Sequence, residues 1–385
     1  MKKTLIAMAA LAAVGAASAQ VSIYGAVDAS FNYMSSGDLS ANKLNNSQLG
    51  SSKLGFTGVE DLGGGMSAIF KLEGGLANDS GNGKSSNSNN QVTGGCTASG
   101  VTPTVAGSVI PCATNGSQGL DFQRYSYVGL KGGFGELRLG REYNMAFQHG
   151  QAATDPFGTN GPADSTLMFY KVGSSTGMAS AVNSSNGISY NSPNMGGVTF
   201  GAMYYMGENT QGPNNNGSGY AGYVDFTGGP VFVTLAQSQT NASPTTTTGF
   251  VNDGAYTQRS LAASYDLGVA KLAFTWAHEE NDSRGNITPK NDALLFGVTV
   301  PMGAMNLKAS YIQATLNTGV AGAKDEKGQL IGLGFDYALS KRTKAYVTYA
   351  TVANTDSARF STGVIDATKK DPTSNNVAVG VFHAF

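Results

Sequence analysis

The sequence predicts an all-β protein, a closed sixteen-stranded antiparallel transmembrane β-barrel. Charged residues make up only 13% of the 385 residues, which is few for a water-exposed surface. Beyond residue 19, however, no stretch approaches the roughly 18 consecutive apolar residues that a membrane helix needs. The chain instead alternates apolar and polar residues over short segments, which is the pattern of β-strands. Without helices, only a closed barrel satisfies every backbone hydrogen bond inside a bilayer.

Residues 1–19 have the pattern of an export signal. Met1–Lys3 is basic, Thr4–Ala16 is apolar but too short to span a bilayer, and Ala17–Ala19 supplies small residues for a signal peptidase. We therefore expect residues 20–385 to form one barrel domain outside the cytoplasm. Loss of the two lysines in the signal leaves 22 instead of 24 basic residues against 25 acidic ones, a net charge of −3. Without a basic excess, the chain is not expected to bind nucleic acid.

The first segment after the signal shows the alternation most clearly. Val21–Tyr33 places apolar residues such as Ile23 and Phe31 on one face, and mostly polar residues such as Asp28 and Asn32 on the other. The same division recurs at Ser52–Glu60, at Met66–Glu73, and where Leu137 and Leu139 alternate with Glu136 and Arg138. A soluble sandwich alternates too, so alternation alone does not decide the fold.

The connections between these segments are more specific. Seven are tight, at Asp61–Gly65, Gly132–Gly133, Asn194–Gly197, Gly228–Pro230, Leu267–Gly268, Pro301–Gly303 and Ser340–Lys341. Eight are longer and polar, near residues 34–51, 77–121, 144–186, 207–218, 239–255, 280–291, 314–328 and 352–374. Fifteen connections join sixteen strands, and their strict alternation places all the long loops at one end. That asymmetry, with short periplasmic turns and long extracellular loops, is typical of an outer-membrane barrel.

The long loop at residues 144–186 is expected to fold into the barrel and narrow it. It carries two acids, Asp155 and Asp164, and several turn-forming pairs. It also carries apolar residues, including Phe157 and Phe169, that a solvated loop would not need. Their presence indicates that the loop packs against the barrel wall.

The chain ends on an aromatic residue, Phe385, inside the predicted last strand Asn375–Phe385. Together with four other segments, this ending resembles the general porins of Gram-negative bacteria, the trimeric type, and particularly their beta-proteobacterial branch. The matching segments are VSIYGAVDASF after the signal, Ser52–Gly75, Arg124–Asn144 and Asp155–Gly158. The resemblance implies that Phe385 belongs to a signal for the outer-membrane assembly machinery, and that the last strand pairs with the first.

In this family the third long loop forms the pore constriction, with acids on the loop facing bases on the wall. The resemblance therefore assigns Asp155 and Asp164 to the loop side. It assigns Lys53 and Arg124 to the wall, because they occupy the basic positions of the family segments S-R-L-G-F and R-x-x-Y-V-G-L. Opposed charges across a narrow wet gap orient water, repel bulky apolar solutes and bias the choice of ion.

The alternation pattern places both bases in the lumen. Leu54 and Phe56 are expected on the face opposite Lys53. By the same reasoning, Tyr125 and Tyr127 are expected on the face opposite Arg124.

Lys71 and Arg138 also fall on inward faces. They either belong to the constriction or merely line a solvated lumen. Relatives often carry an arginine where this chain has Ser189, so the basic wall is thinner than the family implies. We therefore expect mild ion selectivity with a slight preference for anions.

The predicted function is passive diffusion of small hydrophilic solutes and ions through a water-filled channel in the outer membrane of a Gram-negative bacterium. We expect a homotrimer embedded in outer-membrane lipid, with no cofactor, no bound metal and no enzymatic activity. One alternative is a channel that prefers a particular substrate, because Ser189 and Asn191 alter the wall. A second is a surface adhesin that uses the Asn-, Ser- and Gly-rich loop Ala77–Asp121. The third is an enzyme, for which His278 with Glu279 and Glu280 is the suggestive cluster.

The two cysteines, Cys96 and Cys112, lie in the second long loop and are expected to form a disulfide in an oxidising compartment. The disulfide would stabilise this loop by ~3 kcal/mol in the chain-entropy model. In the family this loop can reach a neighbouring subunit, so Cys96→Ser should lower the temperature at which trimers dissociate during electrophoresis. Thr97→Ser is the matched control. Equal heat resistance of the two variants would contradict a role of the disulfide in the trimer.

Overall fold

The computed structural model describes residues 20–84, 120–169, 171–172, 182–208, 217–242, 245–246, 249–250, 254–282 and 287–385. The predicted export signal lies outside the described residues, as do Cys96, Cys112 and most of the second long loop. Within the described ranges, no helix has both the length and the apolar character that crossing a membrane would require.

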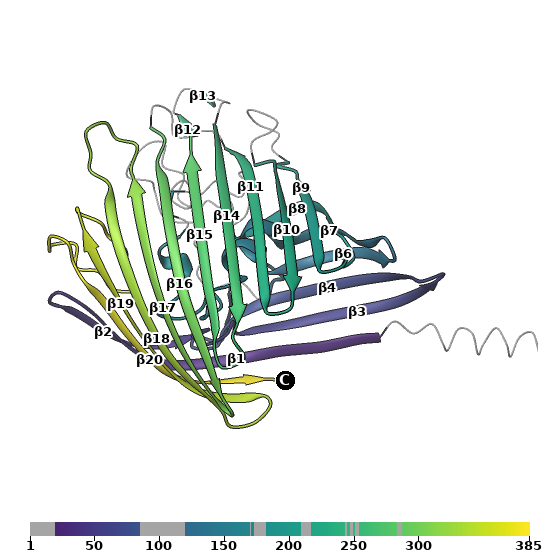
Figure 1. The fold of residues 1–385 in the computed structure, drawn as a ribbon, viewed down its shortest axis with the longest axis horizontal. Helices are drawn as coiled ribbons and strands as arrows, with labels where there is room; N and C mark the ends of the chain where they lie inside the picture. The colour runs from purple at the N-terminus through teal and green to yellow at the C-terminus, as the bar shows by residue number, and fades with distance from the viewer. Residues whose placement is uncertain are drawn as a thin grey trace, which may run out of the picture.

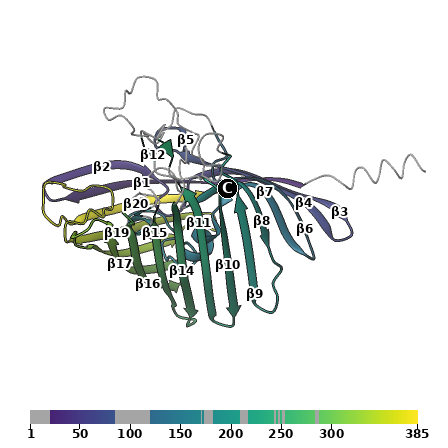
Figure 2. The same ribbon diagram turned by 90° about the horizontal axis from the view of Figure 1, so that it is seen from above.

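One antiparallel sheet closes on itself to form the barrel, seen from the side in Figure 1 and from above in Figure 2. Its sixteen strands are β1 (Gln20–Ser36), β3 (Lys53–Gly63), β4 (Met66–Ala77), β6 (Tyr125–Gly132), β7 (Gly135–Tyr143), β8 (Asn183–Asn191), β9 (Val198–Tyr205), β10 (Gly219–Gly228), β11 (Val231–Ala242), β14 (Gly254–Asp266), β15 (Lys271–Asn281), β16 (Lys290–Met302), β17 (Met305–Asn317), β18 (Glu326–Ala338), β19 (Thr343–Thr355) and β20 (Ser374–Ala384). Pairing of β1 with β20 closes the ring, with Ala26 opposite Ala384. The predicted fold class is confirmed.

Six short elements lie in the connections between barrel strands. Four are strands, β2 (Leu39–Asn46), β5 (Asn82–Lys84), β12 (Thr245–Thr246) and β13 (Gly249–Phe250), and two are helical turns, η1 (Ala146–Gln151) and η2 (Ser165–Leu167). Both helical turns belong to the third long loop, which they help to fold into a compact shape.

Alternation of side chains along the strands separates the two faces of the wall. On β1, Ile23 is 65% exposed on the outside, whereas Asp28 and Asn32 are fully buried on the inside. The outer face is apolar because it meets hydrocarbon, and the inner face is polar because it meets water and the inward loop. The faces predicted for Val21–Tyr33 are therefore confirmed.

All seven predicted tight turns lie between the strands where the sequence placed them. Gly64 and Gly65 connect β3 to β4 with φ values of +62° and +78°, a region that side-chain-bearing residues rarely adopt. Such turns keep one end of the barrel compact and leave the long loops at the other.

The first long loop, predicted at residues 34–51, is mostly strand instead. β1 continues to Ser36, turns at Gly37, and returns as β2, which pairs with β1. The chain then breaks before β3, where the Asp28 carboxylate accepts hydrogen bonds from the backbone nitrogens of Leu49 at 2.6 Å and Gly50 at 2.8 Å. The long connection between β1 and β3 thus lies close to its predicted range, and the sequence did not predict that most of it pairs with β1 as a strand.

The third long loop folds into the barrel as predicted. Its helical turn η1 contacts β10, β11, β14 and β15, and its tip reaches β16 and β18. Phe157, Met168 and Phe169 are buried in a cluster with small and aliphatic residues of the wall, among them Ala277, Ala293, Leu295, Ile312, Ala314, Leu330, Ala350 and Val352. Burial of these apolar side chains stabilises the loop against the wall.

Glycines on the inner wall allow this close approach. A Cβ atom at Gly332 would lie 2.5 Å from that of Ala163, and one at Gly334 would lie 2.6 Å from the Phe157 ring. No side chain fits in that space while the loop stays in place. The wall is therefore shaped for the loop on one side of the lumen.

Gly332→Val should displace the loop while the barrel stays closed. Overpacking of this kind costs about 1–3 kcal/mol. We expect a lower and noisier single-channel conductance, because the loop moves toward the open lumen. The matched control, Ala309→Val, adds similar bulk on the outer face of β17, opposite the outward Leu333. Equal conductance of the two variants, with heat-modifiable mobility intact in both, would contradict a close-packed loop.

Candidate functional site

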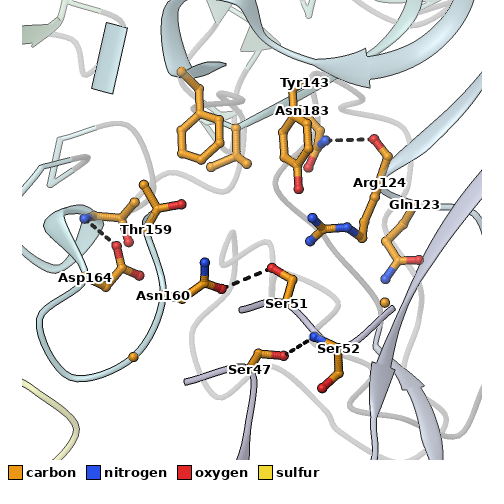
Figure 3. A pocket seen from close by; sticks show the side chains of 15 residues that line it. Ser47, Ser51, Ser52, Gln123, Arg124, Tyr143, Thr159, Asn160, Asp164 and Asn183 are labelled. Atoms are coloured by element: carbon orange, nitrogen blue, oxygen red, sulfur yellow. Dashed lines mark hydrogen bonds between the residues drawn. The ribbon is translucent and has the colours of Figure 1, made fainter. Parts of the chain in front are cut away.

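A water-accessible gap of about 350 Å³ separates the third loop from the opposite wall. Figure 3 shows Gln123 and Arg124 on one side of this gap and Thr159, Asn160 and Asp164 of the loop on the other. Ser47, Ser51 and Ser52, from the break before β3, form its floor in that view. The Ser51 hydroxyl donates a hydrogen bond to Oδ1 of Asn160 at 3.1 Å, so wall and loop touch at this point.

Four inner-wall residues from different strands converge beside the gap. Successive pairing partners across four strands are Tyr24 of β1, Gly55 of β3, Glu73 of β4 and Tyr125 of β6. Paired positions share one face of the sheet, so all four face the lumen. The register between these strands therefore brings Glu73 to the centre of the basic wall.

Glu73 is the hub of that wall. Its carboxylate accepts a hydrogen bond from Nε of Arg124 at 2.6 Å, and it lies 3.7 Å from Nζ of Lys53 and 3.9 Å from Nζ of Lys71. The Tyr24 hydroxyl donates a further hydrogen bond at 2.7 Å. Because Glu73 is only 1% exposed, it holds these bases in place rather than facing the solute path.

The predicted outward faces of Tyr125 and Tyr127 are wrong. Both tyrosines lie inside the lumen, where Nζ of Lys71 is 3.7 Å from the centre of the Tyr125 ring. The outward positions of β6 belong to Val128 and Leu130. Arg124 precedes the first residue of β6, so it does not obey the alternation of that strand and still reaches Glu73.

Arg138 also faces the lumen and is paired with two acids. Its Nε donates to Glu136 at 2.7 Å and its Nη1 to Glu142 at 2.6 Å. Ser189, its partner position on β8, donates a hydrogen bond from its hydroxyl to the same Glu142. Ser189, which stands where relatives often carry an arginine, thus donates a hydrogen bond to an acid and adds no positive charge to the wall.

Asp155 does not face the basic wall. Its buried carboxylate accepts hydrogen bonds from the backbone nitrogens of Phe157 at 2.8 Å, Thr159 at 3.2 Å and Ser165 at 3.2 Å. These bonds hold the two turns of the loop together. The role that the structure supports for Asp155 is therefore to shape the loop.

Asp164 is the loop acid that lines the gap. Its Oδ1 accepts a hydrogen bond from the backbone nitrogen of Thr166 at 2.8 Å, which caps η2. Burial, and after it the charge of Asp155, raises the pKa of Asp164 to about 6, while hydrogen bonds from Thr166 and the charge of Lys171 act in the opposite direction. The Asp164 carboxylate therefore gains or loses its charge near pH 6, within the pH range in which channels are usually recorded.

A family model described as Gram-negative porin matches residues 4–357 of the chain. This chain belongs to the Gram-negative porin family.

Individual relatives agree with the family model. Outer membrane porin protein 32 of Delftia acidovorans is 32% identical over 399 residues, covering all of both chains. An anion-selective porin from Comamonas acidovorans has a similar solved structure, with 27% identity, a TM-score of 0.74, and coverage of 96% of this chain and 100% of that one. The trimer form of OmpT from Vibrio cholerae, 18% identical with a TM-score of 0.62 and covering 96% of this chain and 100% of that one, shares the fold.

The predicted family, with its beta-proteobacterial branch, is confirmed, and so is the outer-membrane location. The chain is a porin that forms a water-filled channel for passive diffusion through the barrel. Its relatives are channels rather than enzymes.

The cluster that suggested an enzyme is divided between the two faces of β15. Glu279 is buried on the inner face, whereas His278 and Glu280 lie on the outer face by alternation. The Glu279 carboxylate accepts hydrogen bonds from the backbone nitrogen of Lys171 at 2.6 Å and from the Tyr256 hydroxyl at 2.9 Å. Glu279 thus anchors the porin's loop, a role that sequence reasoning missed.

A second anchor joins the start of the loop to β10. Nδ1 of His149 lies 2.8 Å from Oδ2 of Asp225, and its ring stacks on Tyr223 with centroids 3.4 Å apart. With Glu279, this pair fixes the loop at both ends against the wall opposite the basic cluster.

Phe385 lies where the barrel closes. Its backbone nitrogen donates to the carbonyl of Gly25 at 3.0 Å, and its ring packs over the same glycine. The pairing predicted between the last and first strands is confirmed. A role of Phe385 in recognition by the assembly machinery stays a prediction.

Lowering the pH through about 6 should increase the porin's preference for anions. Protonation removes the negative charge of Asp164 from the gap, because its raised pKa lies near this value. The reversal potential under a salt gradient should shift with a midpoint near pH 6 in the unaltered protein. Asp164→Asn should show the anion-shifted value at every pH. A midpoint that persists in this variant would assign the titration to another group.

Proposed function

We propose that this porin selects solutes by size and charge at the gap between Asp164 and the cluster of Lys53, Lys71 and Arg124. The observation that carries the proposal is the pairing of those three bases with one buried acid, Glu73. Two positive charges remain uncompensated there, and they face the single carboxylate of Asp164 across the gap. Selectivity should therefore be mild and favour anions slightly.

The charges next to this cluster weaken the preference further. Arg138 is paired with both Glu136 and Glu142, so these three side chains together carry a net negative charge. The transverse field is thus confined to the short distance between the loop and the Glu73 cluster. Small hydrophilic ions of either sign should pass, while bulky apolar solutes should be repelled by the oriented water.

The alternative of a channel that prefers one substrate has less support. Ser189 is only 1% exposed and donates to Glu142, and Asn191 accepts a hydrogen bond from Tyr223 at 3.0 Å. The Ser189 hydroxyl and the Asn191 side-chain oxygen are thus occupied within the wall. The adhesin alternative rests on residues that lie outside those described.

Assembly and targeting complete the proposal. Residues 1–19 serve as an export signal, the mature chain forms a homotrimer surrounded by outer-membrane lipid, and the protein has no enzymatic activity. The apolar outer face supports membrane insertion, since it presents residues such as Ile23, Phe31 and Leu235 to the surroundings. The loop at residues 144–186 acts as the constriction.

Reversal potentials in planar bilayers test the proposal directly. Glu73→Gln should increase anion preference by up to roughly fivefold, because one unit charge about 4 Å away is worth about 1 kcal/mol in water. Lys53→Ala should shift selectivity toward cations, so the two variants must move in opposite directions. Glu60→Gln, an exposed acid near the tight-turn end of β3, is the control and should change nothing. If neither Glu73→Gln nor Lys53→Ala shifts the potential, the filter lies elsewhere.

A further inference from the structure

A groove on the outer wall of the barrel, between β9 and β15, differs in polarity along its length. It has a volume of about 570 Å³. Phe200, Val224, Leu235 and Trp276 line one end, and Gln237 and Arg259 line the other. The groove therefore has an apolar end and a polar, cationic end.

Strand pairing shows that both ends face away from the lumen. Phe200, Val224, Leu235, Leu261 and Trp276 are successive partners in one row across five strands. Val224 is 52% and Leu235 is 58% exposed, as expected of side chains that meet hydrocarbon. The next outward row toward the long loops contains Gly222, Gln237 and Arg259. Gly222 has no side chain, so it leaves the floor of the groove open.

That second row marks the upper limit of the apolar band on this side of the barrel. Beyond Arg259 it continues through His278, Asp292, Thr315 and Lys327. Every member from Gln237 onward is polar or charged, whereas the row below is apolar throughout from Phe200 to Leu294. This change from apolar to polar side chains between two adjacent rows places the boundary between hydrocarbon and lipid headgroups at Arg259.

The neighbouring charges are already paired, whereas Arg259 has no ionic partner in the part of the chain that the structure describes. Nδ1 of His278 lies 2.8 Å from Asp292, and Nζ of Lys290 lies 3.2 Å from Glu280. Arg259 is exposed, and among the described residues no carboxylate lies within ion-pair distance of it. An arginine directed at the headgroup region is suited to an external anion.

We propose that this groove binds one anionic lipid of the surrounding membrane. Its acyl chain lies along Phe200, Val224, Leu235 and Trp276, and its headgroup phosphate is held by the guanidinium of Arg259 with the amide of Gln237. Guanidinium groups bind phosphate oxygens through two parallel hydrogen bonds, and an indole at the boundary is stable beside both regions. The cationic end of the groove lies toward the headgroups and its apolar end toward the hydrocarbon, which matches the orientation of a lipid in the membrane.

A second outer groove shows why the charge matters. It lies over β16 to β19, has a volume of about 450 Å³ and is lined by apolar residues including Val298, Leu307, Leu333, Phe335 and Val347. No outward charged side chain borders it, so it offers an acyl chain no means of selecting a headgroup. Of these two grooves, the one at Arg259 combines both requirements.

The chain's single tryptophan, Trp276, allows a direct test. The full-length protein is reconstituted in vesicles that contain phosphatidylglycerol or phosphatidylcholine with brominated acyl chains, which quench tryptophan fluorescence on contact. We expect phosphatidylglycerol to bind beside Trp276 about fivefold more strongly than phosphatidylcholine, which is the effect of one basic residue near a headgroup. Raising the salt concentration should reduce this preference, because the headgroup contact is exposed.

Two variants separate the groove from a general effect of charge. Arg259→Gln should abolish the preference, so that both lipids quench equally. Lys327→Gln removes an equally outward, exposed cation from the same row but away from the groove, and it should leave the preference intact. Equal quenching by both lipids in the unaltered protein, or a preference that survives Arg259→Gln, would overturn the proposal. Resistance of Trp276 to both lipids would show that a second copy covers this face and would also overturn it.

Discussion

The closure of the sheet by β1 and β20 is the constraint on which the rest of the structure depends. In a bilayer no water can satisfy an open edge, so every backbone group of the wall must pair with a neighbouring strand. Once Ala26 is opposite Ala384, each strand has one face toward lipid and one toward the lumen. Inward charges of the described strands, from Asp28 on β1 to Lys344 on β19, are thereby directed into the same limited space.

That limited space explains how the third loop is held. Its apolar side chains pack against small wall residues such as Ala277 and Ala314, whereas Asp155 and Glu279 satisfy backbone nitrogens that packing would otherwise leave unpaired. Both acids are buried and both act on backbone, so neither adds much charge to the solute path. The loop therefore narrows the pore with its shape and contributes charge mainly through Asp164.

The sequence predicted the barrel, its strand number and most inner faces, because alternation has a period of two and needs no knowledge of strand partners. It failed where position depends on something else. Arg124 and Tyr125 were assigned opposite faces by counting across the start of β6, where the alternation does not hold. The hub role of Glu73 depends on the register of β1, β3, β4 and β6 together, and Asp155 could be distinguished from Asp164 only by the folded turns between them.

Glu73 also explains why the charge balance at the gap can depend on one proton. Three cations confined to one wall would repel one another and lose their orientation, whereas a shared carboxylate holds Arg124 at 2.6 Å and both lysines within 3.9 Å. The same carboxylate removes much of their field from the pore. Because Glu73 lowers the net charge of the wall from three to two, the charge of Asp164 becomes a larger share of what a passing ion encounters, and its raised pKa makes that share sensitive to pH. Without Glu73, the three positive charges of the wall would make the preference for anions less dependent on the protonation of a single loop acid.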